Sequence, residues 1–474
     1  MRCTQSPTTS ARVARRRRRA GSILVWCAFL LIILIAMVGL VIDGGLMLAN
    51  YRESQNAADA AALAAAMDLM LGKTSAEATA TATTIVTGED YNNYYNAAHT
   101  YRNLEGATVV VNIPPTEGPY VGSTHYAEAF VTYPFTTRFM PLLWGFNPNR
   151  TVRARAVAGF EPISIDEGVI ALDPGARPGI AVNGNGTLWV NGKIQINASA
   201  DRYAATTGEH AFMYGTDIEV VGNVDSPTHF LNADPSNPTS PLQTKGMPDP
   251  DIFSHLPTPT VANGVVATNF GKVSITGGTT TLNPGVYDSL AISGTGTTVT
   301  FNPGIYVIKG GSLTLTGGNV TGNGVMFYVT GKDYNPTTGA PDISDPRDPM
   351  NQLPPGNPGS NFGDVTINAA MHFSPIDTTN PLYHYANPDI NNFNGMLFYQ
   401  RRADKAPVRI EGNSAAGNLT GTIYAKWAPF DIAGQGIYSA QFVVGSMKVT
   451  GNGVVTVNYI GRQLGKAPQV FLVE

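Results

Sequence analysis

Apolar residues follow two different patterns along this chain of 474 residues. From Gly21 to Ile42 they form one continuous stretch without a charged residue. A helix of about 22 residues, rising about 1.5 Å per residue, reaches roughly 33 Å and matches a bilayer's hydrocarbon core of about 30 Å. Beyond about residue 163, short Val, Ile, Thr and Leu runs alternate with Gly-Asn and Gly-Gly turns, a pattern typical of strands. The patterns predict one transmembrane helix, 21–42, followed by a mainly β chain.

The charges around the apolar stretch predict its orientation. Five consecutive arginines, Arg15, Arg16, Arg17, Arg18 and Arg19, precede only its N-terminal end. Since basic flanks remain on the cytoplasmic side, we expect a basic cytoplasmic arm at 1–20 and an exported chain after Asp43. A cleaved secretory signal is the alternative, although its apolar region is normally only about 7 to 15 residues long. The two cysteines, Cys3 and Cys27, leave the exported part without a thiol.

The residues after Asp43 predict that the helix continues outside the membrane, over 43–72. Alanine, the strongest helix former, dominates Ala57 to Ala66, and Gly72 is the expected end. Small residues let another surface approach closely. Two uses of this surface remain open, namely packing on the protein's own first domain and contact with another protein.

Residues 73–160 predict a small α+β domain packed on the long helix. A helix is expected from Ala76 to Val86. Apolar and polar residues roughly alternate at Ala107–Ile113, Tyr126–Tyr133 and Thr151–Ala158, which predicts three strands.

The third region, 161–474, contains internal repeats. The stretch Leu282 to Thr300 is echoed by Phe301 to Thr321, with the shared pattern Asn-Pro-Gly-(Val/Ile)-Tyr and a period of about 19 residues. Short strands at such a period predict a parallel β-helix or a similar solenoid, with a β-sandwich as the alternative. Segments dense in Pro, Asn and Asp at about 225–262 and 332–362 are predicted to be loop insertions.

The N-terminal residues resemble the TadE/TadG-like proteins of the Tad (Flp) pilus-assembly system. The resemblance covers about residues 12–70 and continues more loosely to 160, through Ala129–Gly145 and Thr151–Phe160. The motif positions that carry it, which are also the candidate interaction residues, are Asp43, Gly44, Arg52, Gln55, Ala57, Ala58 and Asp59.

This resemblance implies a single-pass protein of the bacterial inner membrane that serves pilus biogenesis or surface adhesion. Its partners would be the lipid bilayer, other pilus-assembly or envelope proteins, and surface glycans, but no nucleic acid. Pilin-like relatives that are processed carry Glu at the fifth position after the cleavage-site Gly, whereas Trp26 follows Gly21 at that distance. The Asp-x-Ser-x-Ser metal motif of longer relatives does not occur in this sequence.

Residues suited to catalysis are scattered, so no enzyme, cofactor or metal site is predicted. The carboxylates in the predicted strands, Asp288, Asp364, Glu411 and Asp431, show no repeated partners, and no Gly-x-Ser-x-Gly or phosphate-binding loop occurs. The seven histidines lack ligand spacing, and Asp342, Asp345 and Asp348 match no dedicated calcium loop.

A basic group, Arg401-Arg402 with Lys405 and Arg409, is interpreted as a solvated charged edge or as a surface for an acidic glycan. The alternative function is a membrane-tethered protein that binds or degrades polysaccharide, since polysaccharide lyases and hydrolases use the β-helix architecture.

Overall fold

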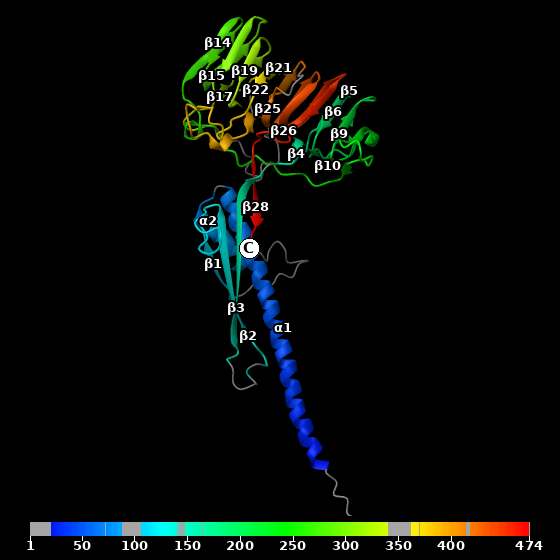
Figure 1. Cartoon of the computed structure of the whole chain (residues 1–474), viewed down its shortest axis with the longest axis vertical. Coiled ribbons are helices and arrows are strands. Elements are labelled where there is room, and N and C mark those ends of the chain that lie inside the picture. Colours follow the sequence, from blue (N-terminus) through cyan, green and yellow to red (C-terminus); the bar gives the residue numbers. More distant parts are fainter. Residues whose placement is uncertain are drawn as a thin grey trace, which may run out of the picture. The chain divides into compact units, whose positions relative to one another are not determined.

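The chain divides into two compact units in a computed structural model that describes residues 20–71, 73–87, 106–139, 141, 147–163, 165–339, 362–368, 370–413 and 418–473. Unit 1 comprises Met1–Phe160 together with Val470–Glu474, and unit 2 comprises Glu161–Gln469 (Figure 1). The described chain is mainly β with few α-helices, as predicted. The last five residues belong to unit 1, which differs from the predicted domain at 161–474.

The described residues of unit 1 include the helices α1 (Ala20–Met70) and α2 (Ser75–Thr87). The prediction of one continuous helix from the apolar stretch through the Ala-rich segment is confirmed, and so is the second helix. At the start of α2, Thr74 and Glu77 form a capping box, in which the Thr74 amide donates to Glu77 Oε2 (2.8 Å) and the Glu77 amide donates to Thr74 Oγ1 (3.3 Å). Gly72, the expected helix end, lies outside the described residues.

The sheet of unit 1 has the strand order β1-β2-β3-β28. Its strands are β1 (Thr108–Asn112), β2 (Tyr126–Thr136), β3 (Asn149–Ile163) and β28 (Ala467–Leu472). The three predicted strands are confirmed and pair in antiparallel order, with β2 between β1 and β3. The fourth strand comes from the far end of the chain, and the Val473 amide next to it donates to the Val157 carbonyl of β3 (2.9 Å).

Small side chains form the core of unit 1. Five alanines of α1 are fully buried, and they pack against alanines of α2, β2 and β3, namely Ala58, Ala61, Ala62, Ala65 and Ala66 against Ala78, Ala82, Ala127, Ala129, Ala154, Ala156 and Ala158. Side chains of this size let the helices and the sheet approach closely. The Ala-rich face is therefore used for packing within the protein's own first domain, which was one of the two predicted uses.

Unit 2 is built from short strands that fall into two sets along the chain. The first set is β4 (Glu167–Ala171), β5 (Ile180–Gly184), β6 (Thr187–Val190), β7 (Lys193–Ile196), β8 (Ala205–Thr207), β9 (Phe212–Gly215), β10 (Asp217–Val220), β11 (Phe230–Asn232) and β12 (Leu242–Thr244). The second set is β13 (Asn269–Ile275), β14 (Gly278–Leu282), β15 (Gly285–Ile292), β16 (Thr297–Phe301), β17 (Gly304–Lys309), β18 (Leu313–Leu315), β19 (Asn319–Gly322), β20 (Val325–Thr330), β21 (Val365–Asn368), β22 (His372–Phe373), β23 (Met396–Gln400), β24 (Val408–Glu411), β25 (Thr420–Ala433), β26 (Gly436–Gly451) and β27 (Val454–Val457). In the part of unit 2 that the structure describes, short 3₁₀ helices also occur at Pro227–His229, Val261–Asn263 and Asn391–Phe393.

Strands of unit 2 pair in parallel with strands that lie about one sequence repeat further on. Gly278 of β14 pairs with Thr297 of β16, and Gly304 of β17 pairs with Val325 of β20. The echoed residues therefore become neighbours. Asn302 Nδ2 donates to Asn283 Oδ1 (2.7 Å), and the rings of Tyr287 and Tyr306 stack with their centroids 6.0 Å apart.

The order of strands along this parallel stack differs from their order in the chain. The second set leads from β13 through β15, β17 and β20 to β23, β25 and β26. β26 then pairs with β4 and β5, the first strands of the unit, through Phe442 with Val169 and Met447 with Ile180. Figure 1 shows this meeting as the red β26 beside the blue-green β4. The first set continues through β7 and β10 to β12.

Residues 245–268, here called the crossing segment, join β12 to β13. A large apolar core is formed by the inward side chains of the strands, including Leu188, Leu290 and Phe398. A second apolar cluster contains outward strand residues such as Tyr328 and Val443 together with Phe253 and Leu256 of the crossing segment. The predicted insertion at 225–262 therefore contains β11, β12 and part of a buried covering segment, while much of the one at 332–362 lies outside the described residues.

Candidate functional site

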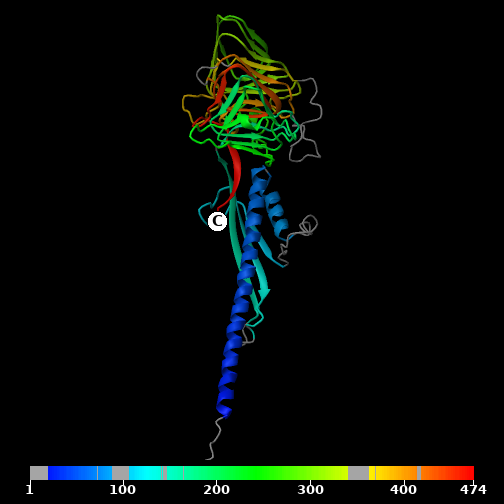
Figure 2. The same cartoon turned by 90° about the vertical axis from the view of Figure 1, so that its right-hand side faces the viewer.

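Asp43, the first of the motif residues, connects α1 to the end of the β2–β3 hairpin. Its side chain is 3% exposed, and its two carboxylate oxygens accept hydrogen bonds from the backbone amides of Arg138 and Phe139, each at 2.9 Å. These amides lie just beyond the end of β2. Figure 2 shows the hairpin extending along α1. Asp43 therefore ties the hairpin end to the helix where the apolar stretch finishes.

Gln55 and Asp59 form a second connection, one to two turns after the exposed Arg52. Gln55 Nε2 donates to Asp59 Oδ1 (2.8 Å) and to the carbonyl of Arg155 on β3 (2.9 Å). The Arg155 side chain in turn donates from Nε to Glu128 Oε1 on β2 (2.7 Å). The motif helix is thus linked by polar contacts to both central strands of its sheet.

Glu128 is the most strongly held carboxylate of unit 1, with its side chain fully buried. Besides Arg155, Asn112 Nδ2 and both the amide and the hydroxyl of Thr116 donate to it. Burial by itself would raise the pKa of Glu128, but these hydrogen bonds lower it to about 2. It is therefore a charged structural anchor.

The other motif positions differ in exposure. Gly44 and Arg52 are exposed, Ala57 is half-buried, and Ala58 is fully buried in the core of the unit. The arginines of the predicted cytoplasmic arm, Arg15 to Arg19, lie outside the described residues. From Val25 to Ile42 the large apolar side chains of α1 are exposed, and this is the one helix in the described chain that is long and apolar enough to cross a membrane.

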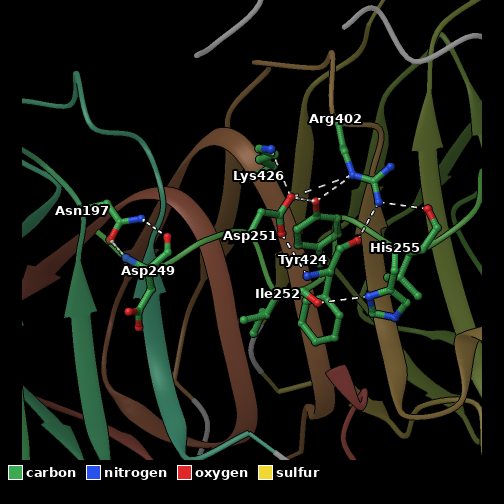
Figure 3. A network of polar contacts seen from close by, with 10 residues as sticks. Asn197, Asp249, Asp251, Ile252, His255, Arg402, Tyr424 and Lys426 are labelled. Atoms are coloured by element: carbon green, nitrogen blue, oxygen red, sulfur yellow. Dashed lines mark hydrogen bonds and ion pairs between the residues drawn. The ribbon is translucent and has the colours of Figure 1, made fainter. Parts of the chain in front are cut away.

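Unit 2 has a buried polar cluster beneath the crossing segment (Figure 3). Asp251 Oδ2 accepts a hydrogen bond from Tyr424 Oη (2.7 Å) and lies 3.2 Å from Lys426 Nζ and 4.0 Å from Arg402 Nε. Burial raises the pKa of Tyr424 well above its usual value, which keeps its hydroxyl a donor. Nearby, the Asn197 side chain makes two hydrogen bonds with the Asp249 backbone, because its Nδ2 donates to the carbonyl (2.7 Å) and its Oδ1 accepts from the amide (3.0 Å). The cluster fastens the crossing segment to strands β7 and β25.

The interpretation of Arg401 and Arg402 as a solvated edge is wrong. The two residues are 2% and 6% exposed. Arg401 Nη1 pairs with Asp333 Oδ1 (2.7 Å), while Arg402 Nη2 donates to the carbonyls of Phe253 (2.6 Å) and Leu256 (2.9 Å). Buried charges require such partners. Lys405 is half-buried, and only Arg409 of this group is exposed.

The candidate carboxylates are not gathered into a catalytic arrangement. Glu411 and Asp431 both lie 3.8 Å from the guanidinium of Arg409, and they form surface ion pairs with it. Elsewhere, Asp288 is half-buried and Asp364 is exposed. Asp404, close to the buried arginines, is 1% exposed, and burial raises its pKa to about 7. Among the described residues no three His, Cys, Asp or Glu side chains could hold a metal ion together. Asp342, Asp345 and Asp348 lie outside the described residues.

Sequence analysis missed Glu128, Asp251, Tyr424 and Lys426. One signal was available, because Lys426 stands between apolar residues in the middle of strand β25 and such a cation needs a buried partner. No comparable signal marks Asp251, whose segment has the composition of a loop.

Comparison with known proteins supports the N-terminal assignment alone. No curated protein and no solved structure matches the chain. One family model does match, Tad, described as "Putative Flp pilus-assembly TadE/G-like", over residues 21–68. This range contains all seven motif residues of the helix, whereas the looser resemblance up to residue 160 stays a prediction. Residues 21–68 thus match the TadE/G-like Flp pilus-assembly model, which is the resemblance that the sequence predicts for the N-terminal module.

Proposed function

We propose that this protein is a membrane-anchored, non-enzymatic component of a Tad-type (Flp) pilus-assembly apparatus, acting in pilus biogenesis or surface adhesion. The observation that carries the proposal is the family match over residues 21–68, which supports a pilus-related role. The match also implies interaction with other pilus-assembly or envelope components. The buried ion pairs and hydrogen bonds described above have structural roles, which favours a scaffold.

The anchor is the apolar part of α1. Its most apolar segment has a mean hydropathy of 3.1 and is only 6% buried within the protein. The core helix of a soluble protein would bury such a face, so lipid is the solvent that suits these side chains. The arginine run before the span favours a cytoplasmic N-terminus in the inner membrane, with the chain after Asp43 outside the cytoplasm.

We further propose that unit 2 is a parallel β-helix-like scaffold. Parallel pairing at intervals of about one repeat, with apolar residues facing inward along neighbouring strands, supports this architecture. The alternative β-sandwich would need antiparallel pairs.

The test is expression of the full chain with a C-terminal tag in a piliated bacterium. Protease added outside the cytoplasmic membrane should reach the tag, the protein should fractionate with the inner membrane, and deletion of its gene should reduce pilus number or attachment. A matched variant with Arg15 to Arg19 replaced by alanine should lose uniform orientation while unit 2 remains folded. A soluble full-length protein, a protease-protected tag, or unchanged pili and attachment after deletion would contradict the proposal.

A further inference from the structure

Three residues at the end of the apolar part of α1, the last of them Asp43 directly after it, face the protein instead of the solvent. Ala36 is half-buried, and Gly39 and Asp43 are buried, while the large apolar residues around them are exposed. Their spacing of three and four residues places them on one helix face. A Cβ atom built on Gly39 would lie 2.7 Å from Cβ of Phe139, so the hairpin end approaches α1 too closely for any other residue. The contact face thus extends into the apolar stretch.

With α1 as the proposed membrane anchor, the position of this contact along the helix fixes the depth of the contact in the membrane. Gly39 lies three residues before Ile42, which is roughly 4.5 Å along the helix. Ala36 lies one turn deeper. Phe139, which packs against Gly39, must therefore also lie at the edge of the hydrocarbon layer.

The chemistry of Asp43 suits this location. Backbone amides that enter lipid must find partners within the protein, and an unpaired carboxylate there is costly. The two oxygens of Asp43 accept hydrogen bonds from the amides of Arg138 and Phe139. These bonds give the amides a partner within the protein and give the carboxylate two donors. The Arg138 side chain is exposed, and a guanidinium at this level can reach phosphate headgroups.

We propose that the end of the β2–β3 hairpin, Thr136–Phe139, is a second membrane contact of this protein, held against α1 by Asp43 and Gly39. Its partner is the headgroup layer of the bilayer that α1 crosses, with Arg138 favouring anionic lipids. The contact restricts tilting of unit 1 on its single helix, since the unit then meets the bilayer at two points. This inference rests on the proposed membrane anchor.

The experiment measures the depth of spin labels in the full-length protein, reconstituted as single copies in lipid nanodiscs containing anionic lipid. Cys3 and Cys27 are replaced by serine, and one label is attached at a time through Phe139→Cys or Arg138→Cys. Val38→Cys, on the lipid-exposed part of α1, is the bilayer reference, and Val121→Cys, an exposed loop position, is the water reference. Collisions with oxygen report lipid, and collisions with a water-soluble nickel complex report solvent.

The labels at 139 and 138 should have accessibilities to oxygen and to the nickel complex like those of the Val38 label, or values between the two references, as expected at the headgroup level. Adding Asp43→Ala should shift them to the water-like accessibility of Val121, with the circular-dichroism spectrum of the protein unchanged as evidence that unit 1 is folded. Water-like labels in the presence of Asp43 would overturn the membrane contact while leaving the anchor intact. A water-like Val38 label would overturn both. Low accessibility to both reagents would instead indicate a protein–protein contact and also overturn the proposal.

Discussion

Replacing Asp251 with asparagine tests whether charge holds the crossing segment in place. The side chains of Asp251, Lys426 and Arg402 are 5%, 2% and 7% exposed, so the substitution leaves two buried cations with one carboxylate fewer. Removing one partner of a buried pair costs about 3–5 kcal/mol. Asparagine still accepts the hydrogen bond from Tyr424, so we expect the lower end of this range, about 3 kcal/mol. That corresponds to a roughly hundredfold larger opening constant.

The assay is hydrogen exchange of the backbone amides in residues 245–268 of the full-length protein, followed by mass spectrometry. Asp251→Asn should accelerate exchange there by roughly a hundredfold, with little change in unit 1. The matched control is Lys426→Met, alone and combined with Asp251→Asn. Since the double variant removes both charges, it should lower the free energy of opening of the crossing segment by about 1–3 kcal/mol less than the sum of the decreases in the single variants. Unchanged exchange in Asp251→Asn, or strictly additive costs, would refute the reasoning.

Three further predictions concern the stability of the two units. The pKa of Glu128 is about 2 in the folded protein and about 4.3 in the unfolded chain. The charged carboxylate therefore stabilises unit 1 fully at pH values above about 4.3, and this stabilisation is lost as the pH falls toward 2. Glu128→Gln should therefore lower the melting temperature of unit 1 clearly at pH 7 and less at pH 3, and an equal loss at both would contradict this. Burial raises the pKa of Asp404 to about 7, above the unfolded value of about 3.9, so unit 2 loses stability as the pH rises from about 4 to 7. Asp404→Asn should remove this loss, so unit 2 of the variant should melt at a higher temperature than the parent at pH 8 but not at pH 4. If the melting temperatures of variant and parent changed equally with pH, Asp404 would not be the group responsible. Deleting Val470–Glu474 removes chain that pairs with β3 and should make unit 1 more sensitive to protease with unit 2 unchanged, whereas equal digestion of both proteins would show that this strand contributes little.

The elements of unit 1 that depend on neighbouring residues could be predicted from the sequence. Helix α2 and strands β1, β2 and β3 follow local periodicity and capping signals, and each was expected within a few residues of its bounds. Strand β28 could not be assigned to this sheet, because its partner β3 lies hundreds of residues earlier and no local pattern identifies a strand's neighbour.

The same limit applies to unit 2. Sequence repeats predict that Asn283 and Asn302 lie side by side, since successive similar strands stack in order. They carry no information on the pairing of β26 with β4, whose sequences are not copies of each other.

The buried arginines were misread for a physical reason. A run of charges is usually solvated, and the segment that covers Arg402 has the Pro-rich composition of an exposed loop. Its role depends on Phe253 and Leu256, two apolar residues whose burial becomes visible only once β12 and β13 have been placed. The motif residues on α1, by contrast, were identified through the resemblance of a contiguous segment to a known family, which depends on the sequence of that segment alone.

The unusual strand order of unit 2 has a topological consequence. Unit 1 contains chain on both sides of unit 2, ending at Phe160 and resuming at Val470, so unit 2 is an insertion into the sheet of unit 1. An inserted unit is best accommodated when its two ends lie close together. In a stack wound in simple chain order, the first and last strands would be separated by about 4.8 Å for every level between them. Here β4 and β26 are direct neighbours, and the crossing segment makes this possible by carrying the chain from β12 to β13. The buried contacts of Asp251 and Arg402 therefore secure the connection on which the insertion depends.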